Sequence, residues 1–97
     1  MYGTVAKMKL KPGMEARMMA ETKSYESLNI PGFLGTMVYK MDTNPNEYYM
    51  TVVFADKDAY SKNANNPEQD KRYRAMLEML VGEPEWHDGE IVYSTKM

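Results

Sequence analysis

The 97-residue sequence contains no cysteine and a single histidine, His87. Without cysteine the chain can form no disulfide, no thiolate metal site and no cysteine nucleophile. One histidine also excludes a histidine-rich metal site within one chain. We therefore expect a protein that uses neither a metal nor another cofactor.

Long apolar runs are also missing, and none approaches the ~20 residues that a membrane-spanning helix needs. The first eleven residues, MYGTVAKMKLK, alternate apolar and basic side chains, unlike the unbroken apolar stretch of a signal peptide. Twelve Lys and Arg against fourteen Asp and Glu give a net charge of −2, which argues against partners that select basic surfaces. We expect a cytoplasmic protein that binds neither nucleic acid nor membranes.

The composition is that of a globular protein, with 43% hydrophobic and 27% charged residues. A chain of this length fits one domain, which we expect to span residues 1–97. Eleven methionines are many for this length. Methionine fills irregular gaps in a core and also lines adaptable binding surfaces, and both interpretations stay open here.

The first half of the chain changes its hydrophobic period at its Pro-Gly pairs. Residues 2–11 alternate with a period of two, which predicts a strand that ends at Pro12-Gly13. From Met14 to Leu28 the apolar residues recur at helical spacing, and Pro31-Gly32 ends this predicted helix.

Two strands are predicted next, at residues 33–41 and 47–55. The segment 42–46 between them, Asp-Thr-Asn-Pro-Asn, has turn chemistry at hairpin length, so the two strands should be antiparallel neighbours. Asp56 is a suitable N-cap for a short helix that reaches Asn63.

The last part of the chain predicts one more helix and one more strand. Asn66 and Pro67 suit the N-cap and first position of a helix that runs to about Leu80. The final strand is expected from Trp86 to Thr95, with a kink or bulge at Asp88-Gly89. The resulting βαββαβ order predicts a ferredoxin-like α+β fold, with an antiparallel four-stranded sheet and its helices on one face.

The two middle strands are apolar on both faces, which predicts a homodimer. Tyr48, Met50, Val52 and Phe54 alternate with Tyr49, Val53 and Ala55, and the preceding strand shows a similar pattern. Two helices can cover only one face of the sheet, so a second copy packed sheet to sheet would cover the other. The alternative is an exposed aromatic face, which is unusual in a monomer.

Two segments carry a resemblance to a known family: PGFLG at residues 31–35 and VFADKDAYSKN at residues 53–63. With the order of elements, they make the chain resemble the antibiotic biosynthesis monooxygenase family of dimeric α+β barrel proteins. The resemblance implies a pocket between sheet and helices in each subunit. It also implies a cofactor-independent monooxygenase that acts on a small aromatic or quinol-like compound.

Some members of that family degrade haem, and the resemblance argues against this activity here. Those members use an asparagine on the first strand, a tryptophan on the helix after the third strand and a histidine on the following helix. The matching positions in this sequence are Ala6, Asn63 and Tyr73, and all three differ.

Three polar residues are the candidates for catalysis: Asn63, Tyr73 and His87. Asn63 can hydrogen-bond a substrate oxygen, or it can simply face water at a helix end. Tyr73 lies on an apolar helical stripe, where its hydroxyl can reach a substrate or only a partner in the core. His87 is the side chain whose charge changes near neutral pH, but neighbours on a strand point to opposite faces, so His87 and Asp88 form no ready dyad.

The residues expected to line the substrate pocket are aromatic or sulfur-containing: Tyr25, Met37, Met50, Phe54, Tyr60, Met76 and Trp86. The first hypothesis is a cofactor-independent monooxygenase that uses this pocket for a small aromatic substrate. The alternative is a non-catalytic dimeric module that binds a small apolar ligand, for which the same residues serve equally well.

Overall fold

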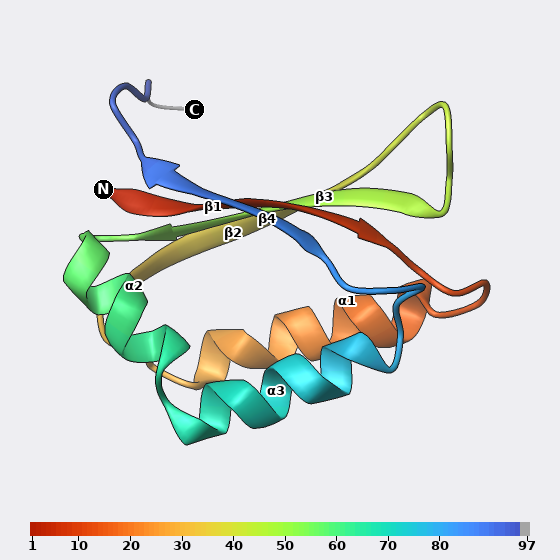
Figure 1. Ribbon diagram of the computed structural model, residues 1–97, viewed down its shortest axis with the longest axis horizontal. Helices are drawn as coiled ribbons and strands as arrows, with labels where there is room; N and C mark the ends of the chain where they lie inside the picture. The colour runs from red at the N-terminus through yellow and green to blue at the C-terminus, as the bar shows by residue number, and fades with distance from the viewer. Residues whose placement is uncertain (96–97) are drawn as a thin grey trace.

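The computed structural model describes residues 1–95 and shows a four-stranded antiparallel sheet with helices on one face (Figure 1). The elements follow in the order β1 (Tyr2–Lys9), α1 (Glu15–Ser24), the 3₁₀ helix η1 (Tyr25–Ser27), β2 (Phe33–Lys40), β3 (Glu47–Phe54), α2 (Lys57–Ala64), α3 (Pro67–Leu77) and β4 (Glu85–Glu90). The strand order across the sheet is β2-β3-β1-β4. The predicted ferredoxin-like fold is confirmed.

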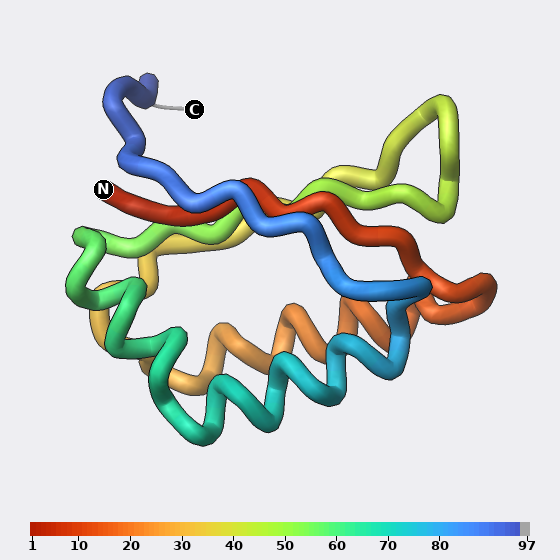
Figure 2. Tube along the Cα trace, in the orientation of Figure 1, coloured from red at the N-terminus to blue at the C-terminus, as the bar shows by residue number. Residues whose placement is uncertain are grey.

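The sheet and the helices form two layers. Helices α1 and α3 run next to each other beneath one face of the sheet, and α2 lies at one end of this layer (Figures 1 and 2). We call the face toward the helices the inner face and the opposite one the outer face. No helix among residues 1–95 has the length and apolar character needed to cross a membrane.

The core lies between the inner face and helices α1 and α3. It contains Ala6, Met8, Leu10, Met18, Tyr48, Met50, Met76, Met79 and Leu80, all nearly inaccessible to solvent. Five of these nine side chains are methionines, so methionine does fill the core. The alternation predicted for the first strand is confirmed, because Thr4, Ala6, Met8 and Leu10 are all buried.

Both predicted helix starts are confirmed by their capping hydrogen bonds. The backbone N–H of Ala59 donates to the Asp56 carboxylate at 2.7 Å, which caps α2. The backbone N–H of Glu68 donates to the Asn66 side chain at 2.9 Å, and Pro67 follows at the first position of α3.

The first helix and the last strand are shorter than predicted. Helix α1 ends at Ser24 and η1 continues it to Ser27, so Leu28 is 42% exposed and lies outside the core. Strand β4 ends at Glu90 and not at Thr95, because its partner β1 begins at Tyr2, which already pairs with Glu90. Beyond Glu90 the Ile91 N–H still donates to the carbonyl oxygen of Met1 at 2.9 Å. Residues 92–95 have no residue of β1 opposite them, although their sequence is typical of a strand.

The predicted irregularity in β4 is wrong, and one occurs in β2 instead. The register of β4 against β1 is continuous through Asp88 and Gly89. In β2, Phe33 pairs with Phe54 and Gly35 with Val53, so Leu34 is an extra residue that shifts the register. Such a bulge changes which face the following side chains occupy, because the strand period is two.

Candidate functional site

A cavity of about 400 Å³ lies between the inner face of the sheet and the helices. This volume is in the range of sites that bind small molecules. Its wall combines side chains from all four strands and from α1, α2 and α3. The lining includes Thr4, Met18, Tyr25, Phe33, Thr36, Met50, Val52, Phe54, Tyr60, Asn63, Tyr73, Met76, Met79, Trp86 and Asp88.

Eight of the ten residues predicted to form the site lie in this wall. They are Tyr25, Met50, Phe54, Tyr60, Asn63, Tyr73, Met76 and Trp86. The structure thus brings them together around one space, while their roles in binding or catalysis stay predictions. Four methionines of the core, Met18, Met50, Met76 and Met79, also line this cavity.

Met37 does not line the cavity, and its predicted place there is wrong. It pairs with Thr51 on the outer face and is 42% exposed. The bulge at Leu34 is the cause, because it places Phe33 and Thr36 on the inner face. In a strand without a bulge, side chains alternate between the two faces, so Met37 would share the inner face with Phe33.

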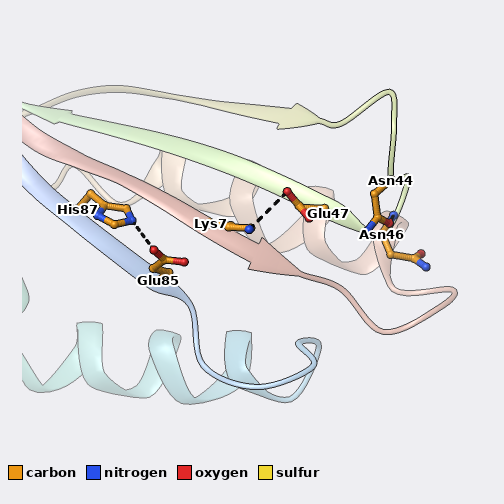
Figure 3. A network of polar contacts seen from close by, with 6 residues as sticks. All are labelled: Lys7, Asn44, Asn46, Glu47, Glu85 and His87. Carbon is orange, nitrogen blue, oxygen red and sulfur yellow. Dashed lines mark hydrogen bonds and ion pairs between the residues drawn. The ribbon is translucent and has the colours of Figure 1, made fainter.

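His87 also lies on the outer face, so the prediction that it serves the pocket is wrong. It pairs with Val5, and its Nε2 lies 2.9 Å from the carboxylate of Glu85 on the same face (Figure 3). The ion pair of Lys7 with Glu47, at 3.8 Å, lies beside it on the neighbouring strands. The alternation of β4 places Trp86 and Asp88, the neighbours of His87, on the cavity side.

Aromatic rings form much of the apolar wall. Phe54 is fully buried and packs edge to face against Phe33 and Tyr60, each with a centroid separation of 5.6 Å. At another part of the wall, the ring centroids of Tyr73 on α3 and Trp86 on β4 are 6.0 Å apart. Such a surface suits a flat aromatic ligand, because rings pack favourably edge to face or offset.

One polar cluster of the cavity was not predicted as a unit. The Tyr60 hydroxyl donates to the Asp88 carboxylate at 2.9 Å, joining α2 to β4. Thr4, the cross-strand partner of Asp88, is only 5% exposed, and its hydroxyl has no hydrogen-bond partner among residues 1–95. Strand alternation was enough to put Thr4 and Asp88 on one face, but the contact with α2 required the folded chain.

The surroundings of Tyr60 hold its hydroxyl in the neutral form. Burial, followed by the hydrogen bond to Asp88 and the charge of that carboxylate, raises the pKa of Tyr60 to about 12. The neighbouring Thr4 hydroxyl acts in the opposite direction with a smaller effect. Burial likewise raises the pKa of Tyr25 and of Tyr48 above the ordinary value.

These pKa shifts predict a loss of stability at alkaline pH. Between pH ~10, where tyrosine ionises in the unfolded chain, and pH ~12, the unfolded state has lost protons that the native state keeps. The free energy of unfolding should therefore fall as the pH rises through this window. Urea unfolding at a series of pH values should show that the free energy of unfolding falls less steeply with pH in Tyr60→Phe than in the native protein. Part of the decrease should remain, because Tyr25 and Tyr48 also have raised pKa values. An identical slope in both proteins would contradict the assignment.

The remaining polar groups of the cavity come mainly from the helices. Asn63 lies near the end of α2, Gln69 and Asp70 lie on α3, and Glu21 lies on α1. The guanidinium of Arg72 is stacked over the Tyr25 ring, 5.6 Å from its centroid. Within residues 1–95, no three His, Asp or Glu side chains converge as metal ligands would.

Comparison with known proteins identifies the family. The sequence model of the antibiotic biosynthesis monooxygenase family matches residues 1–78, most of the chain. The protein belongs to the antibiotic biosynthesis monooxygenase family, as its resemblance implied. Among curated proteins, none matches the sequence significantly.

Solved structures of similar fold cover nearly the whole chain. SnoaB from Streptomyces nogalater, a cofactor-independent oxygenase, aligns with a TM-score of 0.78 and 14% identity, covering 96% of this chain and 94% of its own. A conserved protein from Methanosarcina mazei aligns with a TM-score of 0.77 and 23% identity, over 91% and 89% of the two chains. A proposed antibiotic biosynthesis monooxygenase from Caulobacter crescentus aligns with a TM-score of 0.77 and 21% identity, covering 95% of this chain and 90% of its own. At these identities the likeness shows the fold alone.

Proposed function

We propose that the protein is a cofactor-independent monooxygenase that oxidises a small aromatic or quinol-like compound in the cavity. The observation that carries the proposal is the cavity itself, with an aromatic and methionine-rich wall and a few polar groups aimed into it. Membership of the monooxygenase family and the fold shared with the oxygenase SnoaB support the same activity.

In a reaction without a cofactor, the electrons that reduce O2 come from the substrate. Loss of a proton from an acidic C–H of the substrate gives a carbanion, which passes one electron to O2. The two radicals then combine through a new C–O bond, and a proton converts the peroxide to a hydroperoxide. At a CH2 group, breaking the O–O bond with loss of water gives a ketone, so one atom of O2 enters the product and the other enters water.

The protein would assist these steps by positioning and by hydrogen bonding. The Tyr73 hydroxyl and the Asn63 amide belong to the cavity wall and can hold an oxygen of the substrate as negative charge develops there. The apolar surroundings exclude water and strengthen such hydrogen bonds. The phenol ring of Tyr73 also packs near Trp86, which fixes its position beside the cavity.

Oxygen uptake tests this proposal. The purified protein is mixed with hydroquinones, catechols and anthrones in the presence of a chelator, with a control lacking protein. Uptake should follow protein concentration, and it should fall about 100-fold in Tyr73→Phe and in Asn63→Ala, because each loses one hydrogen bond to the developing charge. Thermal unfolding should show that both variants remain folded. Uptake that stays at the level of the control across the panel would contradict the proposal.

The alternative is a non-catalytic binding module of the same fold, which the same cavity supports. It predicts saturable binding of an aromatic ligand with no product and no oxygen consumed. The variants Tyr73→Phe and Asn63→Ala would then change affinity only. The oxygen measurement and a binding titration on the same compounds therefore separate the two functions.

The proposed functional unit is a cytoplasmic homodimer. The outer face exposes apolar side chains on β1 and β2, including Val5, Met37 and Tyr39, which are 44%, 42% and 47% exposed. Among residues 1–95 no helix covers this face (Figure 1). A second copy packed on it would bury them, as larger apolar patches usually are. Sedimentation analysis should give twice the chain mass of 11.2 kDa, and a monomer at all concentrations would contradict the dimer.

A further inference from the structure

We propose that Asp88 is the acceptor for a hydroxyl group of the ligand, so that the cavity selects aromatic compounds in their protonated, phenolic form. Asp88 lies in the cavity wall at the point where β1, β4 and α2 meet. The inference rests on the proposed function in taking the cavity as the substrate site. Its test nevertheless needs no oxygen and no turnover.

The first observation is the capacity of the Asp88 carboxylate. It accepts one hydrogen bond, from the Tyr60 hydroxyl at 2.9 Å, and among residues 1–95 it forms no ion pair. An ionised carboxylate can accept about four hydrogen bonds, so acceptor sites remain for a ligand. A hydroxyl that donates to a carboxylate forms one of the stronger hydrogen bonds found in proteins.

The second observation is the hydroxyl of Thr4, which is buried without a partner. Thr4 is 5% exposed and lines the same cavity opposite Asp88 in the sheet. A buried hydroxyl without a partner costs free energy, which a bound state can relieve. A ligand hydroxyl bound at Asp88 would lie beside Thr4, whose own hydroxyl can then donate to it or accept from it.

The surroundings of the cluster favour an aromatic ring at this position. Tyr60 packs edge to face on Tyr2 at 5.3 Å and on Phe54 at 5.6 Å, so its hydroxyl is held at the end of an aromatic wall. Trp86, two residues before Asp88 on the same face of β4, continues that wall. A ring placed against these side chains brings a ring hydroxyl toward Asp88.

The charged groups nearby determine the sign of the expected selectivity. The cations nearest the cavity are Lys57, whose Nζ lies 5.8 Å from the centroid of the Tyr2 ring, and Arg72, which is stacked over Tyr25, and neither lines the cavity. The other titratable groups of the cavity are Glu21 on α1, Asp70 and Tyr73 on α3, and Tyr25. The carboxylates therefore outnumber the cations around the ligand, which disfavours a bound phenolate and favours a bound phenol.

The probe for this inference is 4-nitrophenol, because the absorbance of its phenolate reports its own protonation. Bound to the native protein, the probe should have a pKa above its value in water, because the Asp88 carboxylate accepts a hydrogen bond from the phenol and repels the phenolate. In Asp88→Asn the shift should become smaller, with the remainder due to Glu21 and Asp70, and affinity for the protonated probe should fall about tenfold. Asp42→Asn, in the exposed hairpin turn far from the cavity, is the matched control and should behave as the native protein.

The probe 4-nitroanisole, which lacks the hydroxyl proton, controls for ring binding and should bind native protein and Asp88→Asn equally. Equal affinity and equal pKa of 4-nitrophenol in these two proteins would overturn the inference, as would no binding of the probe to the native protein. Oxygen uptake without dependence of phenol binding on Asp88 would refute this inference alone. Phenol binding through Asp88 without oxygen uptake would refute only the proposed oxygenase.

Discussion

Gly3→Ala should destabilise the protein by about 3 kcal/mol, the upper part of the range for overpacked positions. Gly3 lies in β1, an inner strand of the sheet, and pairs with Val53 on one side and Gly89 on the other. A β-carbon at Gly3 would collide with the backbone carbonyl oxygen of Val52. A backbone group in the middle of a sheet cannot move aside as a flexible side chain does, so the strands themselves must separate.

Thermal unfolding would measure this effect, and the midpoint should fall by roughly 15 °C for a domain of this size. Gly35→Ala is the matched control. Gly35 pairs with the same residue, Val53, from the other side, and its added β-carbon would meet nothing within 4 Å. Equal midpoints for the two variants would contradict the close approach of Gly3 in β1 to the Val52 carbonyl oxygen in β3.

Val52→Trp should reduce oxygen uptake at least 100-fold while the chain still folds. Val52 lies on the inner face of β3, between Thr4 and Thr36, and its side chain forms part of the cavity wall. An indole at this position would occupy space that the substrate needs, and displacing a substrate by about an ångström can cost about 100-fold in rate. The loss should appear equally in binding of an aromatic ligand.

The control for this substitution is Val81→Trp, which adds the same ring at a position that is 52% exposed and outside the cavity. It should retain native uptake. Val52→Leu fills less of the cavity and should give an intermediate loss, which keeps the test valid if the tryptophan variant fails to fold. Full activity in a folded Val52→Trp would contradict the proposed location of the active site.

Most of the fold could be predicted because local signals and hydrophobic period agree. Asp56, Asn66 and Pro67 mark the helix starts, and the turn at residues 42–46 marks the hairpin. The end of β4 could not be predicted, because it depends on the length of β1. Residues 91–93 carry a strand-like pattern, but Tyr2 already uses Glu90 as its partner.

The site was predicted where a helical stripe or a regular strand fixes the direction of a side chain, as for Tyr73 on α3 or Met50 on β3. The prediction was wrong for Met37, because the extra residue Leu34 moves the side chains after it to the opposite face of the sheet. The sequence gives no clear sign of this bulge. The cluster of Thr4, Tyr60 and Asp88 was missed because its members lie far apart in the chain. Only the packing of α2 against β1 and β3 brings the last two together.

The central claim is that this cavity performs a monooxygenase reaction, and isotopically labelled dioxygen tests it most directly. The native protein would be incubated under labelled O2 with a substrate found by oxygen uptake, and the product would be analysed by mass spectrometry. The account predicts one labelled oxygen atom in each product molecule, with the other in water, and no labelled product from Val52→Trp. Two results would contradict the account. One is a product whose new oxygen atom comes from unlabelled water, and the other is oxidation of the substrate in which O2 is reduced only to hydrogen peroxide.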